Sequence, residues 1–298
     1  MALWLFLAAL AQLLNAATIL IDKYVLSCVN CGSRTPVAYA FYISLLSGFV
    51  LVLVPFGQVS LPSIEVLLLC ILTALAYITS IVLLYSAIQT TPPSDVIPVV
   101  GATSAITTFG FAYLFLRQDL PDTFLLAFVF LVFGTFLISH YRFTRHSLIQ
   151  VLAAGALFGT SAFLIKLIFL ETTFIDGFFW SRMTNVIGAF LLLLLPGTLS
   201  AVKLSATQTT QSTKWLVVGN KTLSGVAFVL TLLAIQLGSV SVVNALSGLQ
   251  FVFLLSFAVL GAKHFPKILQ GEVHSYSLFH KSIGVTFIVI GFVTLFIR

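Results

Sequence analysis

The sequence predicts an all-α membrane protein with ten transmembrane helices, arranged as two inverted repeats of five helices. Composition is the first observation: hydrophobic residues make up 60% of the 298-residue chain and charged residues 7%, whereas a soluble domain carries about 25% charged residues. Second, the apolar residues fall into stretches of about 20, the length that a helix needs to cross a bilayer. Third, one apolar helix–turn–helix pattern occurs twice, half the chain apart.

The repeated pattern is the strongest internal signal in the sequence. Residues 82–101 read VLLYSAIQTTPPSDVIPVVG, and residues 229–248 read VLTLLAIQLGSVSVVNALSG. An offset of 147 residues (229 − 82) matches eight of the 20 positions, including Gly101 with Gly248. An internal repeat determines the architecture of a chain, so the protein is expected to contain one five-helix unit twice.

The length criterion places ten helices along the chain. Most prolines lie at or near the ends of these helices, where a missing N–H costs least. Pro98 lies one turn inside its helix, either as a tolerated first-turn proline or as a local break that frees carbonyls toward a cavity. The expected helices are 3–21, 37–56, 64–88, 95–116, 123–141, 148–170, 178–196, 215–236, 241–261 and 281–297.

Because five is an odd number, the second unit enters the membrane from the side opposite to the first. We therefore expect inverted repeats in residues 1–141 and 148–298, related by a pseudo-two-fold axis in the membrane plane. Such repeats are typical of secondary transporters, in which the halves exchange conformations and open a midplane site to each side in turn. The repeat thus predicts transport without the help of any motif.

The distribution of Lys and Arg predicts the orientation. Most of them lie in or beside the connections 22–36, 141–147, 197–214 and 262–280, which share one side. The positive-inside rule places that side in the cytoplasm and both termini outside. The net charge of +6 includes no basic run for nucleic acid. The expected partners are the lipid bilayer and a small-molecule substrate, for a multi-pass monomer or homodimer in the cytoplasmic membrane of a prokaryote.

Enzymatic chemistry and a resident cofactor or metal are not expected. All five histidines fall in or beside loops on one face, so no membrane serine has a histidine partner at a plausible depth. Cys28 and Cys31 form a CxxC pair, but no second pair or nearby histidine accompanies it. None of the eight carboxylates lies near a helix centre. A proton relay through a midplane carboxylate is therefore excluded, and coupling would use amides, hydroxyls, carbonyls or no ion.

Polar residues inside predicted helices are the candidate substrate-binding residues, because they are costly in hydrocarbon and usually face a bundle interior. Hydroxyls can bond their own helix or a neighbouring one, whereas amides have more groups to satisfy. Lys166 and Arg182 are expected to snorkel to the interface, with attraction of an anionic substrate as the alternative. The candidates are Asn15, Tyr77, Thr103, Lys166, Arg182, Asn185, Asn244, Ser247 and Gln250.

Small residues spaced four apart predict close helix packing. Gly155 and Gly159 form such a pair in one predicted helix, and Ser44 and Gly48 form another. The phrases VFGTFLI and VIGFVTL, which contain Gly134 and Gly291, match the fifth helix to the tenth.

Several of these apolar phrases resemble the EamA-type members of the drug/metabolite transporter superfamily. GALFGTSAFLIKL (155–167) resembles the first-helix phrase of that family and ends in its typical Lys at Lys166. FFWSRMTNVIGAF (178–190) resembles the next helix, with the family's Arg at Arg182. The resemblance implies ten helices around a central cavity lined by helices 1–4 and 6–9. It also implies transport, as an exporter, of a small metabolite, with helices 3/4 and 8/9 as gates.

The sequence departs from the family at two places. The usual Gly-Glu after helices 4 and 9 is Arg117-Gln118 and Gly261-Ala262 here. Small multidrug relatives carry a first-helix Glu where this chain has Gln12 and Asn15, which argues against proton/drug antiport by that device. Three competing hypotheses remain. An exchanger for sugar phosphates or nucleotide sugars predicts cationic residues deep in the cavity, and a lipid-carrier flippase predicts a lateral apolar opening between helices. The third is a membrane scaffold that does not transport.

The two copies of the hairpin are expected to differ in flexibility. Pro92, Pro93 and Pro98 stiffen the first copy, and the matching residues of the second copy, Ser239, Val240 and Ala245, carry no proline. Hydrogen–deuterium exchange should therefore be faster in the turn 237–240 than in the turn 90–94. Equal protection of the two turns would contradict this.

Overall fold

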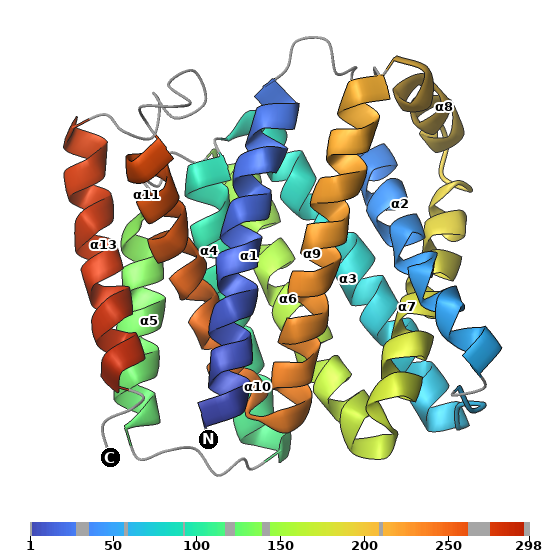
Figure 1. Ribbon diagram of the computed structural model, residues 1–298, viewed down its shortest axis with the longest axis horizontal. Coiled ribbons are helices and arrows are strands. Elements are labelled where there is room, and N and C mark those ends of the chain that lie inside the picture. The colour runs from blue at the N-terminus through green and yellow to red at the C-terminus, as the bar shows by residue number, and fades with distance from the viewer. Residues whose placement is uncertain are drawn as a thin grey trace.

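The computed structural model describes residues 2–27, 36–56, 59–91, 93–116, 123–138, 144–208, 211–261 and 275–294. In these residues all regular secondary structure is helical, and most helices stand side by side in one bundle (Figure 1). The α-helices are α1 (Ala2–Ser27), α2 (Pro36–Leu46), α3 (Ile64–Thr90), α4 (Pro93–Phe111), α5 (Phe124–Ile138), α6 (Arg145–Glu171), α7 (Phe174–Leu192), α8 (Thr198–Gln208), α9 (Gln211–Leu237), α10 (Val240–Ala245), α11 (Leu249–Gly261) and α13 (Ser275–Thr294).

Helices long and apolar enough to cross a membrane confirm the prediction of a multi-pass membrane protein. By length and composition, five such spans lie in α1, α3, α4, α6 and α9, and shorter apolar helices accompany them in α2, α5, α10 to α11 and α13. Helix α7 is not among these spans, because Asp176, Arg182 and Asn185 lower its hydropathy. The long spans begin or end at the same two faces of the bundle, which fits an embedding in lipid (Figure 1).

Helices α3, α6 and α7 each begin at a hydroxyl residue that caps them. Ser63 accepts a hydrogen bond from the Val66 N–H at the start of α3, and Thr144 accepts one from the Ser147 N–H at the start of α6. Thr173 caps α7 in the same way. Such caps satisfy backbone donors that the first turn of a helix leaves free, so they determine where these helices enter the bundle.

The helices differ from the expected ones in local geometry. The predicted helix 37–56 continues from α2 into a 3-10 helix, Ser47–Phe56, and the predicted helix 95–116 ends in a π-helical segment, Ala112–Leu116. The predicted helix 241–261 is interrupted by a 3-10 turn at Leu246–Gly248. The connection 197–214 contains α8, which the sequence analysis treats as a loop. The CxxC pair and residues 262–274 lie outside the described residues.

Pro98 does not interrupt its helix, because α4 runs through it from Pro93 to Phe111. This agrees with a tolerated proline near the start of a helix and not with a local break. The break is in the other copy of the hairpin, directly after Ala245, the residue that matches Pro98. The two copies of the hairpin thus share their overall course and differ where their sequences differ.

Glycines bring two pairs of helices into close contact. A Cβ on Gly155 would lie 2.7 Å from the Thr103 Cβ, and a Cβ on Gly159 would lie 2.8 Å from the Thr107 Cβ. These contacts join α6 to α4, as the small-residue spacing predicts. Helix α5 packs on α13 in the same manner, because a Cβ on Gly134 would lie 2.8 Å from the Ile288 backbone nitrogen.

Replacement of Gly159 by Ala should destabilise the bundle. A new methyl group at this position meets α4 backbone and side-chain atoms, and overpacking of this kind costs about 1–3 kcal/mol. Thermal unfolding in detergent measures the effect. Gly225→Ala in α9 is the matched control, since a Cβ there meets nothing within 4 Å and Ala favours a helix over Gly. A Gly159→Ala protein as stable as the control would contradict the close packing of α4 and α6.

Candidate functional site

The most unusual polar group of the bundle is the guanidinium of Arg182 on α7. Its side chain is 3% exposed. The guanidinium carbon lies 4.5 Å from the ring centroid of Phe228 on α9 and 5.6 Å from that of Tyr77 on α3. The guanidinium carbon thus lies over both aromatic rings, a position in which a ring attracts a cation. The Nε and Nη2 atoms are buried and have no hydrogen-bond partner among the described residues.

Asn185 lies one helical turn beyond Arg182 and is fully buried. Residues three apart share one side of a helix, so its amide is a neighbour of the guanidinium along α7. Neither the oxygen nor the nitrogen of this amide has a hydrogen-bond partner among the described residues. Buried polar groups are almost always paired, so two adjacent exceptions on one helix require an explanation.

The packing of α7 on α3 positions this pair. Thr184 donates a hydrogen bond to the Cys70 carbonyl oxygen at 3.2 Å, across the two helices. Gly188 leaves no room for a Cβ against the Ile78 side chain. The α7 backbone therefore lies close to α3 on both sides of Asn185, and this closeness directs Arg182 to the Tyr77 ring.

Lys166, unlike Arg182, has hydrogen-bond partners for its charged group. Its Nζ donates hydrogen bonds to the carbonyl oxygens of Ile235 at 2.9 Å, Gln236 at 3.1 Å and Gly238 at 2.9 Å. These carbonyls lie at the C-terminal end of α9, where a helix lacks internal donors and favours a cation. Lys166 therefore joins α6 to the end of α9 and has all three of its protons engaged.

The expectation that Lys166 and Arg182 snorkel to the interface is wrong. The side chains are 9% and 3% exposed, so both cations are held inside the protein. The physical reason is that each finds a better environment there than at the interface. The end of α9 offers three carbonyl oxygens to Lys166, and the rings of Tyr77 and Phe228 flank Arg182.

A second polar group joins α4, α6 and α10. Asn244 donates to the hydroxyl oxygen of Thr108, and its amide nitrogen lies 3.5 Å from the Ser104 hydroxyl oxygen. The Thr108 hydroxyl in turn reaches the Gly159 carbonyl oxygen at 3.1 Å. This chain of contacts spans the seam where α6 and α4 pack through glycine. It holds α10 just before the 3-10 turn that interrupts the helix.

The remaining predicted residues fall in separate places. Thr103 faces Gly155, and its hydroxyl oxygen is buried without a partner among the described residues. Ser247 lies in the 3-10 turn, with its hydroxyl oxygen 3.7 Å from the position a Cβ would take on Gly101. Asn15 and Gln250 are half-buried, and no described contact brings their side chains to either polar group. Tyr77, Arg182 and Asn185 are thus the predicted residues that the fold brings together around unpaired donors.

Sequence reasoning missed a polar latch at one end of the bundle, formed by Ser60, Thr173, Asp176 and Trp180. The Asp176 carboxylate accepts hydrogen bonds from the Ser60 N–H at 2.8 Å, the Ser60 hydroxyl at 2.9 Å and the Thr173 hydroxyl at 2.8 Å. Trp180 Nε1 donates to the Ser60 carbonyl oxygen at 2.8 Å. The T-x-x-D spacing of Thr173 and Asp176 is a capping signal that the sequence offers.

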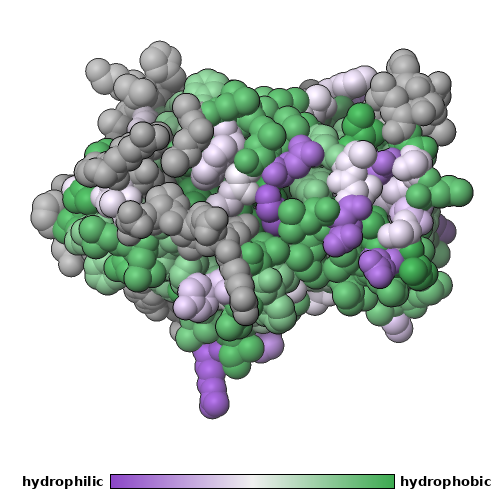
Figure 2. Space-filling model, turned by 90° about the horizontal axis from the view of Figure 1, so that it is seen from below, coloured by the Kyte–Doolittle hydropathy of each residue, from purple (hydrophilic) through white to green (hydrophobic). Residues whose placement is uncertain are grey.

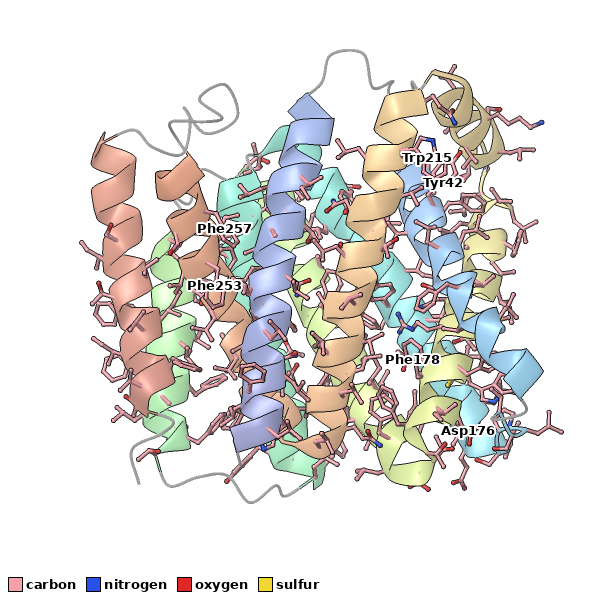
Figure 3. The ribbon with its side chains drawn as sticks, viewed as in Figure 1. Tyr42, Asp176, Phe178, Trp215, Phe253 and Phe257 are labelled. Atoms are coloured by element: carbon pink, nitrogen blue, oxygen red, sulfur yellow. The ribbon has the colours of Figure 1, made fainter. Side chains whose placement is uncertain are left out.

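The latch joins the segment before α3 to the first turns of α7. Asp176 lies at the lower end of the bundle, and Tyr42 and Trp215 lie near the opposite end (Figure 3). Seen from the lower end, the surface that is not drawn in grey is largely hydrophobic, with scattered hydrophilic residues (Figure 2). The latch therefore closes one end of the bundle between α3 and α7.

The comparisons with known proteins show the fold alone. No family model matches the chain, and no curated protein matches it. Among solved structures, 26 chains are similar. One, described only as a crystal structure of a protein, has a TM-score of 0.68 with 15% sequence identity, and the match covers 97% of this chain and 98% of that one. The chain therefore shares its whole fold with a solved protein, from one end to the other.

The latch predicts a response to acid. Burial raises the pKa of the Asp176 carboxyl, but the hydrogen bonds from Ser60 and Thr173 outweigh burial and hold the pKa below its usual value. A lowered pKa means that the ionised form stabilises the fold above the pKa of the unfolded chain and that this stability is lost as the pH falls through the folded value. Acidification toward pH 3 should therefore lower the melting temperature of the wild type more than that of Asp176→Asn. Parallel pH profiles for the two proteins would contradict the role of the carboxylate.

Proposed function

We propose that the protein is a secondary transporter, an exporter of a small metabolite related to the EamA-type carriers. In this proposal ten helices form two inverted five-helix repeats, in residues 1–141 and 148–298, that alternate between two conformations. Neither a cofactor nor catalysis is part of the proposed mechanism. The support comes from the pattern of helix contacts, which is reciprocal in the way that a two-fold axis requires.

The reciprocity holds for the helix pairs at the centre of the bundle. If the second half repeats the first, α6 corresponds to α1, α9 to α3 and α10 with α11 to α4. Helix α3 packs on α6, and the corresponding pair, α9 and α1, also packs together. Helix α4 packs on α6, and α11 packs on α1. Each of these two contacts of α6 thus has a counterpart at α1 with the roles of the halves exchanged.

The contact of α5 with α13 is reciprocal at the level of single residues. The matching phrases align Gly134 with Gly291, an offset of 157 residues (291 − 134). A Cβ on Gly134 would clash with Gly284 and Ile288, and a Cβ on Gly291 would clash with Ala127 and Leu131. The same offset relates these neighbours, because 284 − 127 and 288 − 131 are both 157. A self-complementary contact of this kind is what a two-fold interface produces.

The reciprocity is broken at one place. Helix α3 packs on α7 and is joined to it by the latch, whereas the corresponding pair, α9 and α2, shows no packing of comparable extent in the described residues. Inverted repeats that hold different conformations are the basis of alternating access, since exchange of the two conformations opens the opposite side. The latched end is opposite to the basic loops, so the positive-inside rule makes it the outer end.

A reconstituted-vesicle screen tests transport directly. We expect saturable flux of at least one small metabolite class into vesicles that contain the protein and none into empty vesicles. Runs with and without a proton gradient determine coupling, and the lack of a midplane carboxylate predicts flux that does not depend on the gradient. Absence of flux for every class tested would favour a scaffold.

A cross-link across the latch should stop transport. Replacement of Ser60 and Asp176 by Cys, in a protein without Cys28, Cys31 and Cys70, places two thiols where hydroxyl and carboxylate oxygens are 2.9 Å apart. A thiol-specific cross-linker would hold the outer end closed, so flux should fall to the level of empty vesicles and return when a reducible linker is cleaved. The two single-Cys proteins are the controls. Unchanged flux through the cross-linked protein would contradict alternating access at this end.

A further inference from the structure

We propose that Arg182 and Asn185 form the anion-binding part of the substrate site, and that the substrate is a small organic acid bound through a single carboxylate group. This inference rests on the proposed transport function and adds the chemical class of the substrate. It is carried by three observations: the geometry of the free donors, the lack of a counter-ion and the number of charges available.

The free donors of Arg182 form one edge of the guanidinium. Nε and Nη2 lie side by side on that edge, and both are buried without a hydrogen-bond partner among the described residues. Two parallel N–H groups of this kind match the two oxygens of a carboxylate and donate to them at about 2.7–2.9 Å. The guanidinium carbon lies over the rings of Tyr77 and Phe228, which offer no acceptor oxygen, so the unpaired edge is the part of the cation left for an anion.

The charge of Arg182 has no counter-ion among the described residues. The carboxylate nearest to it along α7, Asp176, is engaged with Ser60 and Thr173 in the latch. A buried cation without a paired anion destabilises a protein, and cation–π contacts offset only part of that cost. Lys166 shows how this fold satisfies a structural cation, with three carbonyl oxygens. Arg182 has no such acceptors among the described residues, so we expect its counter-ion to be a ligand that binds and dissociates.

The number of charges favours a carboxylate over a phosphate. Lys166 is engaged with the end of α9, and Lys221 on α9 acts on Tyr77 through its charge, so Arg182 is the cation of this region whose donors are buried and unpaired among the described residues. A phosphate monoester carries about −1.5 to −2 charges at neutral pH and would remain partly uncompensated, whereas a carboxylate carries one. The Asn185 amide adds a donor for the carboxylate and an acceptor for a neighbouring hydroxyl or ammonium group of the substrate. A sugar-phosphate exchanger is less well matched by this set of groups.

Access to the site requires movement of α9. The free nitrogens are buried, and Phe228, which covers one face of the guanidinium, belongs to α9. Helix α9 packs extensively on α1, whereas its packing against α2 and α7 is slight compared with that of α3 against α7. An outward shift of α9 together with α1 would therefore uncover Arg182 and leave the contact between α3 and α7 intact.

Thermal unfolding in detergent with added anions tests the inference. The probes are sodium acetate, lactate, pyruvate and benzoate, with sodium chloride and sodium phosphate at matched ionic strength and mixed micelles containing phosphatidylglycerol. At least one carboxylate should raise the melting temperature in a saturable manner, whereas chloride, phosphate and phosphatidylglycerol should not. Arg182→Lys keeps the charge but lacks the donor edge, so its affinity for that carboxylate should fall by about tenfold or more. Arg145→Gln, which removes an exposed arginine, should bind as the wild type does.

Asn185→Asp provides a test that does not depend on the folding of the Arg182 variant. The new carboxylate stands one turn from the guanidinium and supplies the missing anion within the protein. We expect a higher melting temperature without ligand and no further rise with the carboxylate. A lower melting temperature together with an unchanged carboxylate response would overturn the site.

The remaining outcomes separate the inference from the function on which it rests. A larger shift with phosphate or phosphatidylglycerol than with any carboxylate would overturn the substrate class. Flux of a neutral solute that is unaffected by Arg182→Lys would overturn the site and leave transport in place. Saturable carboxylate binding that depends on Arg182, with no carboxylate flux in vesicles, would confirm the site and overturn transport.

Discussion

Every polar group inside this bundle must find its partner within the protein, because the hydrocarbon core of a membrane offers none. The structure meets this constraint through contacts between residues that are far apart in the chain. Lys166 satisfies the end of α9, and Asn244 reaches Thr108 across α4. Each contact also fixes the position of one helix against another. The polar residues thus hold the bundle together, and the unpaired groups of Arg182 and Asn185 are the ones to which we propose that the substrate binds.

Glycine packing and polar pairing determine which parts of the bundle can move. Gly155 and Gly159 hold α6 on α4 at distances that exclude even a methyl group, and Gly134 and Gly291 do the same for α5 and α13. Close packing of this type resists sliding, since the facing backbones leave no free space. In contrast, α9 packs along its length on α1, is held at its end by the long and flexible side chain of Lys166, and makes few contacts with α2 and α7. No close glycine contact joins α9 to α2 or α7 in the described residues, so this is the side on which we propose that the bundle opens.

The helices were largely predictable from the sequence, whereas the partners of the polar residues were not. Hydropathy and helix length place the apolar helices because both depend on neighbouring residues. The 3-10 turn at Leu246–Gly248 is marked only by a Ser-Gly dipeptide, and the same dipeptide at Ser224-Gly225 lies inside the continuous helix α9, so this signal alone does not predict the turn. Lys166 and its acceptor Ile235 are 69 residues apart, and Asp176 and Ser60 are 116 apart. The snorkelling expectation failed for this reason: hydropathy registers the charge of a residue but not the carbonyls or rings that meet it.

The same reasoning explains why Arg182 is informative and Lys166 is not, although the sequence presents them as a matched pair. A cation buried among acceptors is explained by the fold that it stabilises. Arg182 is flanked by aromatic rings, and one edge of its guanidinium and the neighbouring amide are unpaired among the described residues. These buried groups lower the stability of the protein because they form no compensating hydrogen bond. A protein can retain this loss of stability when a bound ligand compensates for it during part of its functional cycle. Under the proposed function, the ligand-bound state and the open state would differ in whether Arg182 has its anion.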